Sequence, residues 1–130
     1  MTTPLKVLLW TEEEDHEELL AYNLIREGFA VASVSDEEDI VPQNLAISPD
    51  VILMGDCSSD EKFIQITEEI KENSTGKGPA IVCITTRSII DVDDPVCKTT
   101  DACLTLPAKP RDIIAKIVAV VTEIETKNCC

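Results

Sequence analysis

Acidic and hydroxyl side chains that could do chemistry follow three of the apolar segments of this sequence. Glu12 and Glu13 come directly after the first segment, Asp56 follows another, and Thr85 ends a third. Three carboxylates brought together could hold a divalent cation weakly. Solvated acidic residues at the start of a helix, stabilised by the helix dipole, explain Glu12 and Glu13 more simply. We therefore prefer that interpretation and expect no bound metal.

Other reactive residue types have simple structural explanations. His16 is the only histidine, and because no plausible nucleophile lies beside it, we expect a partly buried structural histidine. Asp93 and Asp94 precede a proline, and a turn explains them better than acid/base chemistry, since adjacent residues in a turn point apart. The six cysteines show no C-x-x-C pair and no metal-ligand spacing, so we interpret most as small buried apolar residues.

Charge and length exclude several classes of function. The formal net charge of −14 repels phosphate backbones and anionic lipids, so we expect no binding to nucleic acid or membranes and look to neutral or basic protein partners. The chain fits one domain, expected over residues 1–124 with a C-terminal tail at 125–130. The first apolar run is too short for a signal peptide or a membrane span, which predicts a cytoplasmic location.

Apolar runs that alternate with helical patterns define the expected fold. Short buried strands are predicted at residues 6–10, 29–34, 50–54, 80–84 and 102–106. Together with helices between them, they predict a doubly wound α/β domain, with one five-stranded parallel sheet and helices on both faces. In such a sheet, a site lies at the carboxyl ends of the strands, beside the point where strand order reverses.

The connecting helices are predicted with different regularity. In the first, Leu19, Leu20, Leu24 and Ile25 recur at helical spacing before Gly28. The second should be short or irregular because Pro42 interrupts it. Residues 87–101 are polar and poorly periodic, so the fourth helix should be irregular or short. The last helix is expected over residues 111–126, where isoleucines and valines form an apolar stripe.

Three segments together resemble the receiver domains of two-component response regulators. KVLLWTEEEDHEELLAYNLIREGFAV resembles the family's first strand, acidic pair and first helix, and SPDVILM resembles the strand that leads to the phosphoacceptor. CLTLPAKPRDIIAKIVAVV resembles the last strand, turn and final helix. The resemblance implies the flavodoxin-like receiver fold. It also implies a site in which carboxylates hold Mg²⁺, one carboxylate accepts a phosphoryl group, and a hydroxyl and a lysine contact the phosphate.

This sequence departs from the family pattern at almost all of those positions. The acidic pair falls on Thr11 and Glu12, followed by Glu13; the phosphoacceptor falls on Gly55, the hydroxyl on Ile84, the lysine on Leu106 and the switching aromatic on Cys103. The metal and the lysine would neutralise charge on the transferring phosphoryl group, so their loss argues against phosphotransfer. Trp10, which ends the first strand, should serve in packing, although it could also fill the vacated phosphate pocket.

A shift of one residue offers a second interpretation of the site. It would place Asp56 at the acceptor position and Thr85 at the hydroxyl position. The shift requires two separate strand bulges and still leaves Leu106 in place of the lysine. Lys109 lies three residues further on, across Pro107, and could reach back only by an unusual route.

We therefore predict an atypical receiver, or pseudo-receiver, that acts in signal transduction as a phosphorylation-independent interaction module without enzymatic activity or cofactor. Its partner would be a signalling protein or a second copy, bound through the last strand and helix. Ile114, Val118 and Val121 would form the contact face. Val118 and Val120 make the apolar stripe of the last helix wider than packing on a sheet requires, which indicates either an interaction surface or a larger core.

The alternative function is a phosphoacceptor receiver that uses Asp56 with a rearranged Mg²⁺ site. A small enzyme on a related fold is disfavoured, because no Gly-rich phosphate loop follows the first strand.

Overall fold

A five-stranded parallel sheet forms the centre of the computed structural model, which describes residues 5–11, 14–55, 59–73, 78–85, 100–105 and 109–128. The strands are β1 (Lys6–Trp10), β2 (Ala30–Ser33), β3 (Val51–Met54), β4 (Ala80–Thr85) and β5 (Ala102–Thr105). Their order in the sheet is β2-β1-β3-β4-β5, and every pair is parallel. This confirms the predicted sheet and places the reversal of strand order between β1 and β3.

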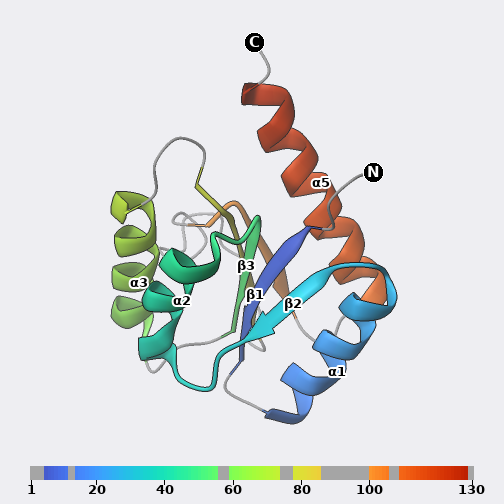
Figure 1. Ribbon diagram of the computed structural model, residues 1–130, viewed down its shortest axis with the longest axis horizontal. Coiled ribbons are helices and arrows are strands. Elements are labelled where there is room, and N and C mark those ends of the chain that lie inside the picture. The colour runs from blue at the N-terminus through green and yellow to red at the C-terminus, as the bar shows by residue number, and fades with distance from the viewer. Residues whose placement is uncertain are drawn as a thin grey trace.

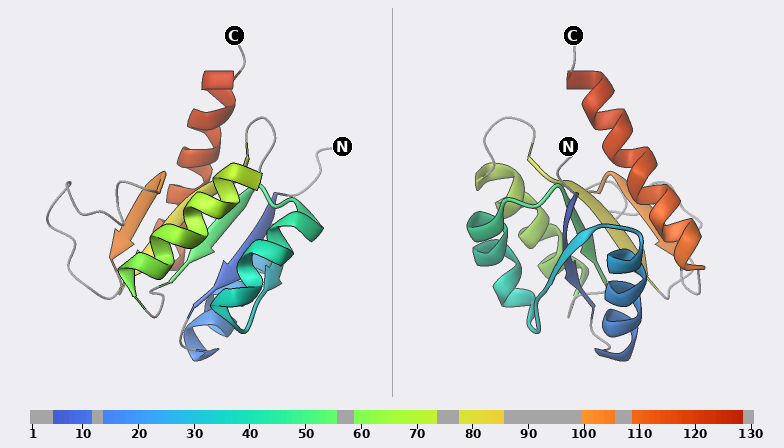
Figure 2. Two further views of the ribbon diagram at one scale, coloured as in Figure 1. Left: turned by 90° about the vertical axis from the view of Figure 1, so that its left-hand side faces the viewer. Right: turned by 45° about the vertical axis from the view of Figure 1, so that its right-hand side comes forward.

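Helices cover both faces of the sheet. On one face lie α1 (Glu14–Arg26) and α5 (Pro110–Asn128), and on the other lie α2 (Ile40–Ile47) and α3 (Asp60–Asn73) (Figures 1 and 2). The doubly wound arrangement is therefore as predicted. The last turns of α5 extend beyond the layers of the domain (Figure 2). Most of the segment 87–101, where we expected an irregular or short fourth helix, lies outside the described residues.

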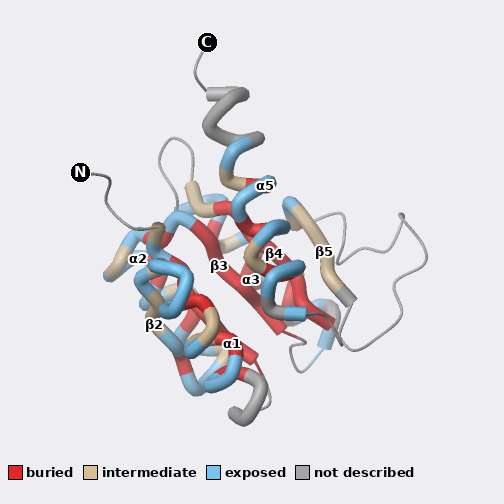
Figure 3. The backbone as a smooth tube through the Cα atoms, turned by 90° about the vertical axis from the view of Figure 1, so that its right-hand side faces the viewer, coloured by how far each residue is buried: buried red, intermediate tan, exposed pale blue. Residues whose placement is uncertain are grey.

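The core consists of two layers separated by the sheet, because side chains of successive strand residues point to opposite faces. In β1, Val7 and Leu9 pack toward α1 and α5, whereas Leu8 and Trp10 pack toward α2 and α3. All four residues are buried, as are all residues of β3 and β4 (Figure 3). Burial on both faces explains why these strands are continuous apolar runs in the sequence.

Two helix boundaries differ from those expected. A short 3₁₀ turn (Glu37–Asp39) leads into α2, so Pro42 lies in the first turn of the helix. The N–H groups of that turn have no partner within a helix, and a proline there interrupts nothing. The helix ends at Ser48, whose backbone is left-handed (φ 48°) and whose N–H donates to the Asn44 carbonyl. At the other end of the chain, α5 continues to Asn128, past the helix end predicted at residue 126.

An aspartate before each of β3 and β5 extends the sheet at the edge where the strands begin. The Asp50 carboxylate accepts a hydrogen bond from the Lys6 N–H at 2.8 Å, and Asp101 accepts one from the Ile81 N–H at 2.8 Å. The backbone N–H of each aspartate donates back to the same neighbour, Lys6 or Ile81. Each aspartate therefore helps to hold the register of the neighbouring strand.

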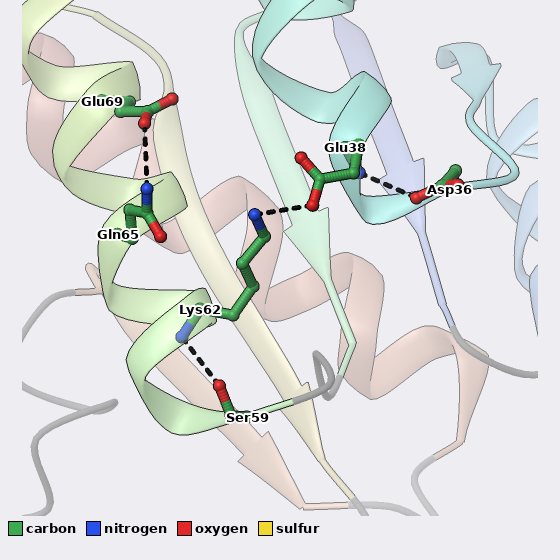
Figure 4. A network of polar contacts seen from close by, with 6 residues as sticks. All are labelled: Asp36, Glu38, Ser59, Lys62, Gln65 and Glu69. Atoms are coloured by element: carbon green, nitrogen blue, oxygen red, sulfur yellow. Dashed lines mark hydrogen bonds and ion pairs between the residues drawn. The ribbon is translucent and has the colours of Figure 1, made fainter.

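At the opposite edge, an ion pair links the segment after β2 to the start of α3 (Figure 4). Lys62 Nζ lies 2.6 Å from the Glu38 carboxylate. Side chains also cap both helical starts: Ser59 Oγ accepts from the Lys62 N–H at 3.0 Å, and Asp36 accepts from the Glu38 N–H at 3.0 Å. Both charged residues of the ion pair therefore lie beside a cap that positions their backbone.

The ion pair predicts a pH dependence of stability. The hydrogen bond to Glu38 and the negative charges nearby raise the pKa of Lys62 above its ordinary value. Because the folded-state pKa is the higher one, this contribution to stability is complete below the ordinary lysine pKa and is lost as pH rises through the raised value. Urea unfolding should therefore show that Lys62→Met is less stable than the wild type at neutral pH. The difference should shrink in strongly alkaline buffer.

Lys116→Met removes an exposed lysine from α5 and is the matched control. We expect its stability relative to the wild type to change little over the same pH range. If both variants gave the same pH profile, the ion pair would contribute nothing specific to stability.

Candidate functional site

The carboxyl ends of β1, β3 and β4 meet at the point where strand order reverses. Trp10 is the register partner of Met54, and Met54 is the partner of Cys83. The residues that follow these three are Thr11, Gly55 and Ile84, so the structure brings three of the predicted site positions to one level of the sheet. The Gly55 N–H donates to the Trp10 carbonyl at 2.8 Å, which holds the two chain segments together just beyond the strands.

Gly55 lies in close contact with the end of β1. A Cβ atom at this position would lie 3.1 Å from Thr11 Cα, and 3.4 Å from both Thr11 Cβ and the Trp10 carbonyl oxygen. Gly28 and Gly78 have positive φ angles, but Gly55 does not. Close contact rather than backbone conformation therefore favours glycine here, and a side chain at residue 55 would need Thr11 to shift by a few tenths of an ångström.

The hydroxyl position of the family is occupied by an aliphatic side chain. Ile84 is buried in the core between the sheet and the α1/α5 layer, together with Leu53 and Val82. Its neighbour Thr85 is also buried, with 1% of its surface exposed, and alternation along β4 directs the two side chains to opposite faces. Thr11 is buried as well. The described part of this edge is therefore closely packed.

Trp10 belongs to the core between the sheet and the α2/α3 layer, which is the packing role we expected. It is 6% exposed and shares this cluster with Val34, Ile40 and Met54. Its indole Nε1 is buried without a hydrogen-bond partner. A buried donor of this kind costs about 1–3 kcal/mol, so the tight packing of the ring is maintained at some expense in stability.

Several predicted site residues fall outside the described part of the chain. These are Glu12, Glu13, Asp56 and Leu106. Among the residues that the structure describes, no group of three or more histidines, cysteines, aspartates and glutamates is arranged to hold a metal ion. The acidic pocket and the shifted acceptor at Asp56 stay predictions.

Two further residues of the described site lie in β5 and directly before α5. Cys103, at the position of the switching aromatic, is partly buried, and its Sγ lies 3.3 Å from Thr100 Oγ1. Lys109 is exposed, and its carbonyl oxygen accepts hydrogen bonds from the N–H groups of Asp112 and Ile113 at the start of α5.

The expected contact face on α5 is only partly exposed. Ile114 and Val121 are partly buried against the α1/α5 core, and Val120 is buried within it. For Val120, the extension of the core is therefore the right explanation. Val118 remains 46% exposed.

A second apolar surface, on α1, was not predicted. Leu19 and Ile25 share one helical pattern with Leu20 and Leu24 in the sequence, but only the latter two are buried. Leu19 and Ile25, together with Tyr22, are each more than half exposed, at a spacing of three residues. We call these three residues the α1 stripe. The sequence contains the signal for two separate faces of the helix. Leu20 and Leu24 are four residues apart on one face, and the residues of the α1 stripe follow one another at intervals of three on another.

The described helices include none with the length and apolar character needed to cross a membrane.

No protein-family model matches the sequence, and no curated protein matches it. Solved structures, in contrast, resemble the fold closely. A fusion that carries the trimeric coiled coil of yeast Spc42 aligns with a TM-score of 0.85 and 18% identity, over 98% of this chain and 85% of that one.

Two response regulators show which fold this is. Chemotaxis response regulator CheY4 of Vibrio cholerae aligns with a TM-score of 0.80 and 17% identity, over 91% of this chain and 99% of its own. A CheY-like receiver domain protein from Methanospirillum hungatei aligns with a TM-score of 0.79 and 14% identity, over 97% of this chain and 100% of its own. This chain has the receiver fold. At such low identity the likeness concerns the fold alone, so the chemistry of the site has to be argued from the residues of this chain.

In this receiver fold, the close approach at Gly55 can be tested by its effect on stability. At an unhindered position with an allowed backbone conformation, Gly→Ala stabilises a protein by about 0.4–1 kcal/mol. Overpacking against Thr11 Cα and the Trp10 carbonyl should outweigh that gain, so we expect Gly55→Ala to lower the free energy of unfolding by about 1–2 kcal/mol in urea. Unchanged or increased stability would show that β1 and β3 separate easily and that the site can accept a side chain.

Proposed function

We propose that this receiver-like domain acts in signal transduction by binding a protein partner, without phosphoryl transfer, enzymatic activity or a cofactor. The observation that carries the proposal is Gly55 at the predicted phosphoacceptor position, which offers no carboxylate and whose Cβ position lies in tight contact with β1, 3.1 Å from Thr11 Cα. A side chain at this position would crowd Thr11.

The surrounding residues support the same conclusion. Phosphoryl transfer depends on cations and hydrogen-bond donors placed around the developing charge. Here a threonine, Thr11, stands at the first acidic position, and Ile84 turns the hydroxyl position into part of the core. The register between β1, β3 and β4 is continuous to the ends of β1 and β3, without an extra residue. This continuity counts against the strand bulges that a shifted site would require.

The alternative proposal, phosphorylation at Asp56, depends on residues that lie one position further along the chain. Asp56 directly follows Gly55, and Thr85 directly follows Ile84. With Glu12 as a ligand for Mg²⁺, these residues would form a rearranged acceptor site. The buried position of Thr85 at the end of β4 is the observation that favours this alternative.

The proposed partner is a neutral or basic signalling protein, because a chain of net charge −14 repels acidic surfaces and other copies of itself. We place the contact on the exposed part of α5 around Val118 and consider the α1 stripe a second candidate surface. The absence of nucleic-acid and membrane partners follows from this charge, and a cytoplasmic location belongs to the same proposal.

A titration with Mg²⁺ and beryllofluoride, a mimic of the phosphoryl group, tests the proposal. We expect the amide resonances of Gly55, Thr85 and Cys103, and the fluorescence of Trp10, to stay unchanged at millimolar concentrations. Trp10 is a suitable reporter because it is the only tryptophan and is buried next to the site. Saturable, simultaneous changes would contradict the proposal. Their loss in Asp56→Asn would assign phosphorylation to Asp56.

Sedimentation velocity over a range of protein concentrations tests whether the partner is a second copy. We expect a monomer at low ionic strength, because charge repulsion between copies is screened least there. A dimer that disappears in Val118→Lys would instead assign the α5 face to self-association. The variant Thr122→Lys adds the same charge at a polar, exposed position one turn further along α5 and serves as the control.

A further inference from the structure

A pocket of about 370 Å³ opens at the edge of the sheet where the strands begin, opposite the candidate site. Its lining comes from the end of α2, the end of α3 and the segments that enter β3 and β4; the residues are Asn44, Leu45, Ser48, Pro49, Asn73, Gly78 and Pro79. The volume lies at the lower end of the range of about 300–1,000 Å³ typical of small-ligand sites. None of these residues belongs to the site discussed above, so the pocket is independent of the proposed function.

The side chain of Asn44 makes this pocket more than a surface hollow. Asn44 is 5% exposed, and its backbone carbonyl accepts the hydrogen bond from the Ser48 N–H. Its side-chain amide, however, forms no hydrogen bond with any other residue in the described part of the chain. Since Asn44 lines the pocket and its amide has no partner among the described residues, a molecule bound there can form hydrogen bonds with it.

The walls of the pocket offer hydrogen-bond acceptors more than donors. Pro49 and Pro79 have no N–H group. The Nδ2 of Asn73 already donates to the Glu69 carbonyl at 2.8 Å, which leaves the Asn73 amide oxygen to accept. The helices α2 and α3 both end here, and the last carbonyl groups of a helix have no partners within it and carry partial negative charge.

One cation is already attracted to this edge. Lys6 Nζ donates to the Ile47 carbonyl, in the last turn of α2, at 3.5 Å. The apolar part of the lining consists of Leu45, which is 57% exposed, and the two proline rings. A ligand that matches both features would combine a cationic group rich in N–H donors with an apolar stem.

We propose that this pocket binds a guanidinium group carried on an alkyl stem. Guanidinium has five N–H donors and no acceptor, so it complements the oxygen atoms of Asn44 and Asn73. The net charge of −14 attracts a cation, and the stem can pack on Leu45 and the prolines. The group could belong to an arginine side chain of a protein or to a free small molecule, and its chemistry is the same in both.

The test is an amide NMR titration of the full chain with N-acetyl-argininamide and, separately, with agmatine. We expect saturable shifts of the Asn44 and Asn73 side-chain amides and of the Gly78 backbone amide. Tighter binding of the capped arginine would identify a protein side chain as the source, and tighter binding of agmatine a free small molecule. If neither ligand gives saturable shifts, the proposal is wrong.

Two variants of one residue make the test specific. Asn44→Ala should weaken binding about tenfold or more, because it removes a hydrogen bond to a charged group. Asn44→Asp keeps the shape and adds a negative charge, so it should bind more tightly than the wild type. Ala119→Ser changes an exposed residue of α5, on the opposite face of the sheet, and should bind like the wild type. Equal affinity in Asn44→Asp and Asn44→Ala would overturn the proposal, and circular dichroism checks that each variant is folded.

Discussion

The structure depends on the burial of β1, β3 and β4 on both faces of the sheet. With helices above and below, the backbone N–H and C=O groups of these strands can be satisfied only by the neighbouring strands. The register between the strands is therefore fixed along their whole length. Thr11, Gly55 and Ile84 lie together because of that register, and the distance between their backbones is set by the sheet rather than by any ligand.

The same constraint explains how the receiver fold can be kept with a glycine at the end of β3. With glycine at residue 55, the Trp10 carbonyl and the Thr11 backbone approach so closely that the site becomes part of the packing of the domain. Ile84 and Trp10 extend the two core layers to the same edge. The described residues at this edge therefore contribute to the stability of the domain through their packing.

The sequence predicted the fold well because buried parallel strands are continuous apolar runs, which need no knowledge of their neighbours. It was less successful with helices, whose faces depend on what packs against them: Leu19 and Ile25 proved exposed, and Val120 proved buried. The spacing of the resemblance pointed to Gly55, but only the structure shows how closely its Cβ position approaches Thr11. The pocket around Asn44 could not have been found in this way, because its polar residues and prolines come from distant segments.

The strand order also has a consequence for how the chain folds. Since all strands are parallel, no pair can form as a hairpin, and each pairing requires a loop of the chain to close. Ile81 and Asp101, which join β4 to β5, are 20 residues apart, whereas Lys6 and Asp50, which join β1 to β3, are 44 apart. Loop closure costs more entropy as the loop lengthens, and distant pairings slow folding. We therefore expect the two halves of the sheet to form first and to meet last between β1 and β3, at the edge where Gly55 allows the backbones to close.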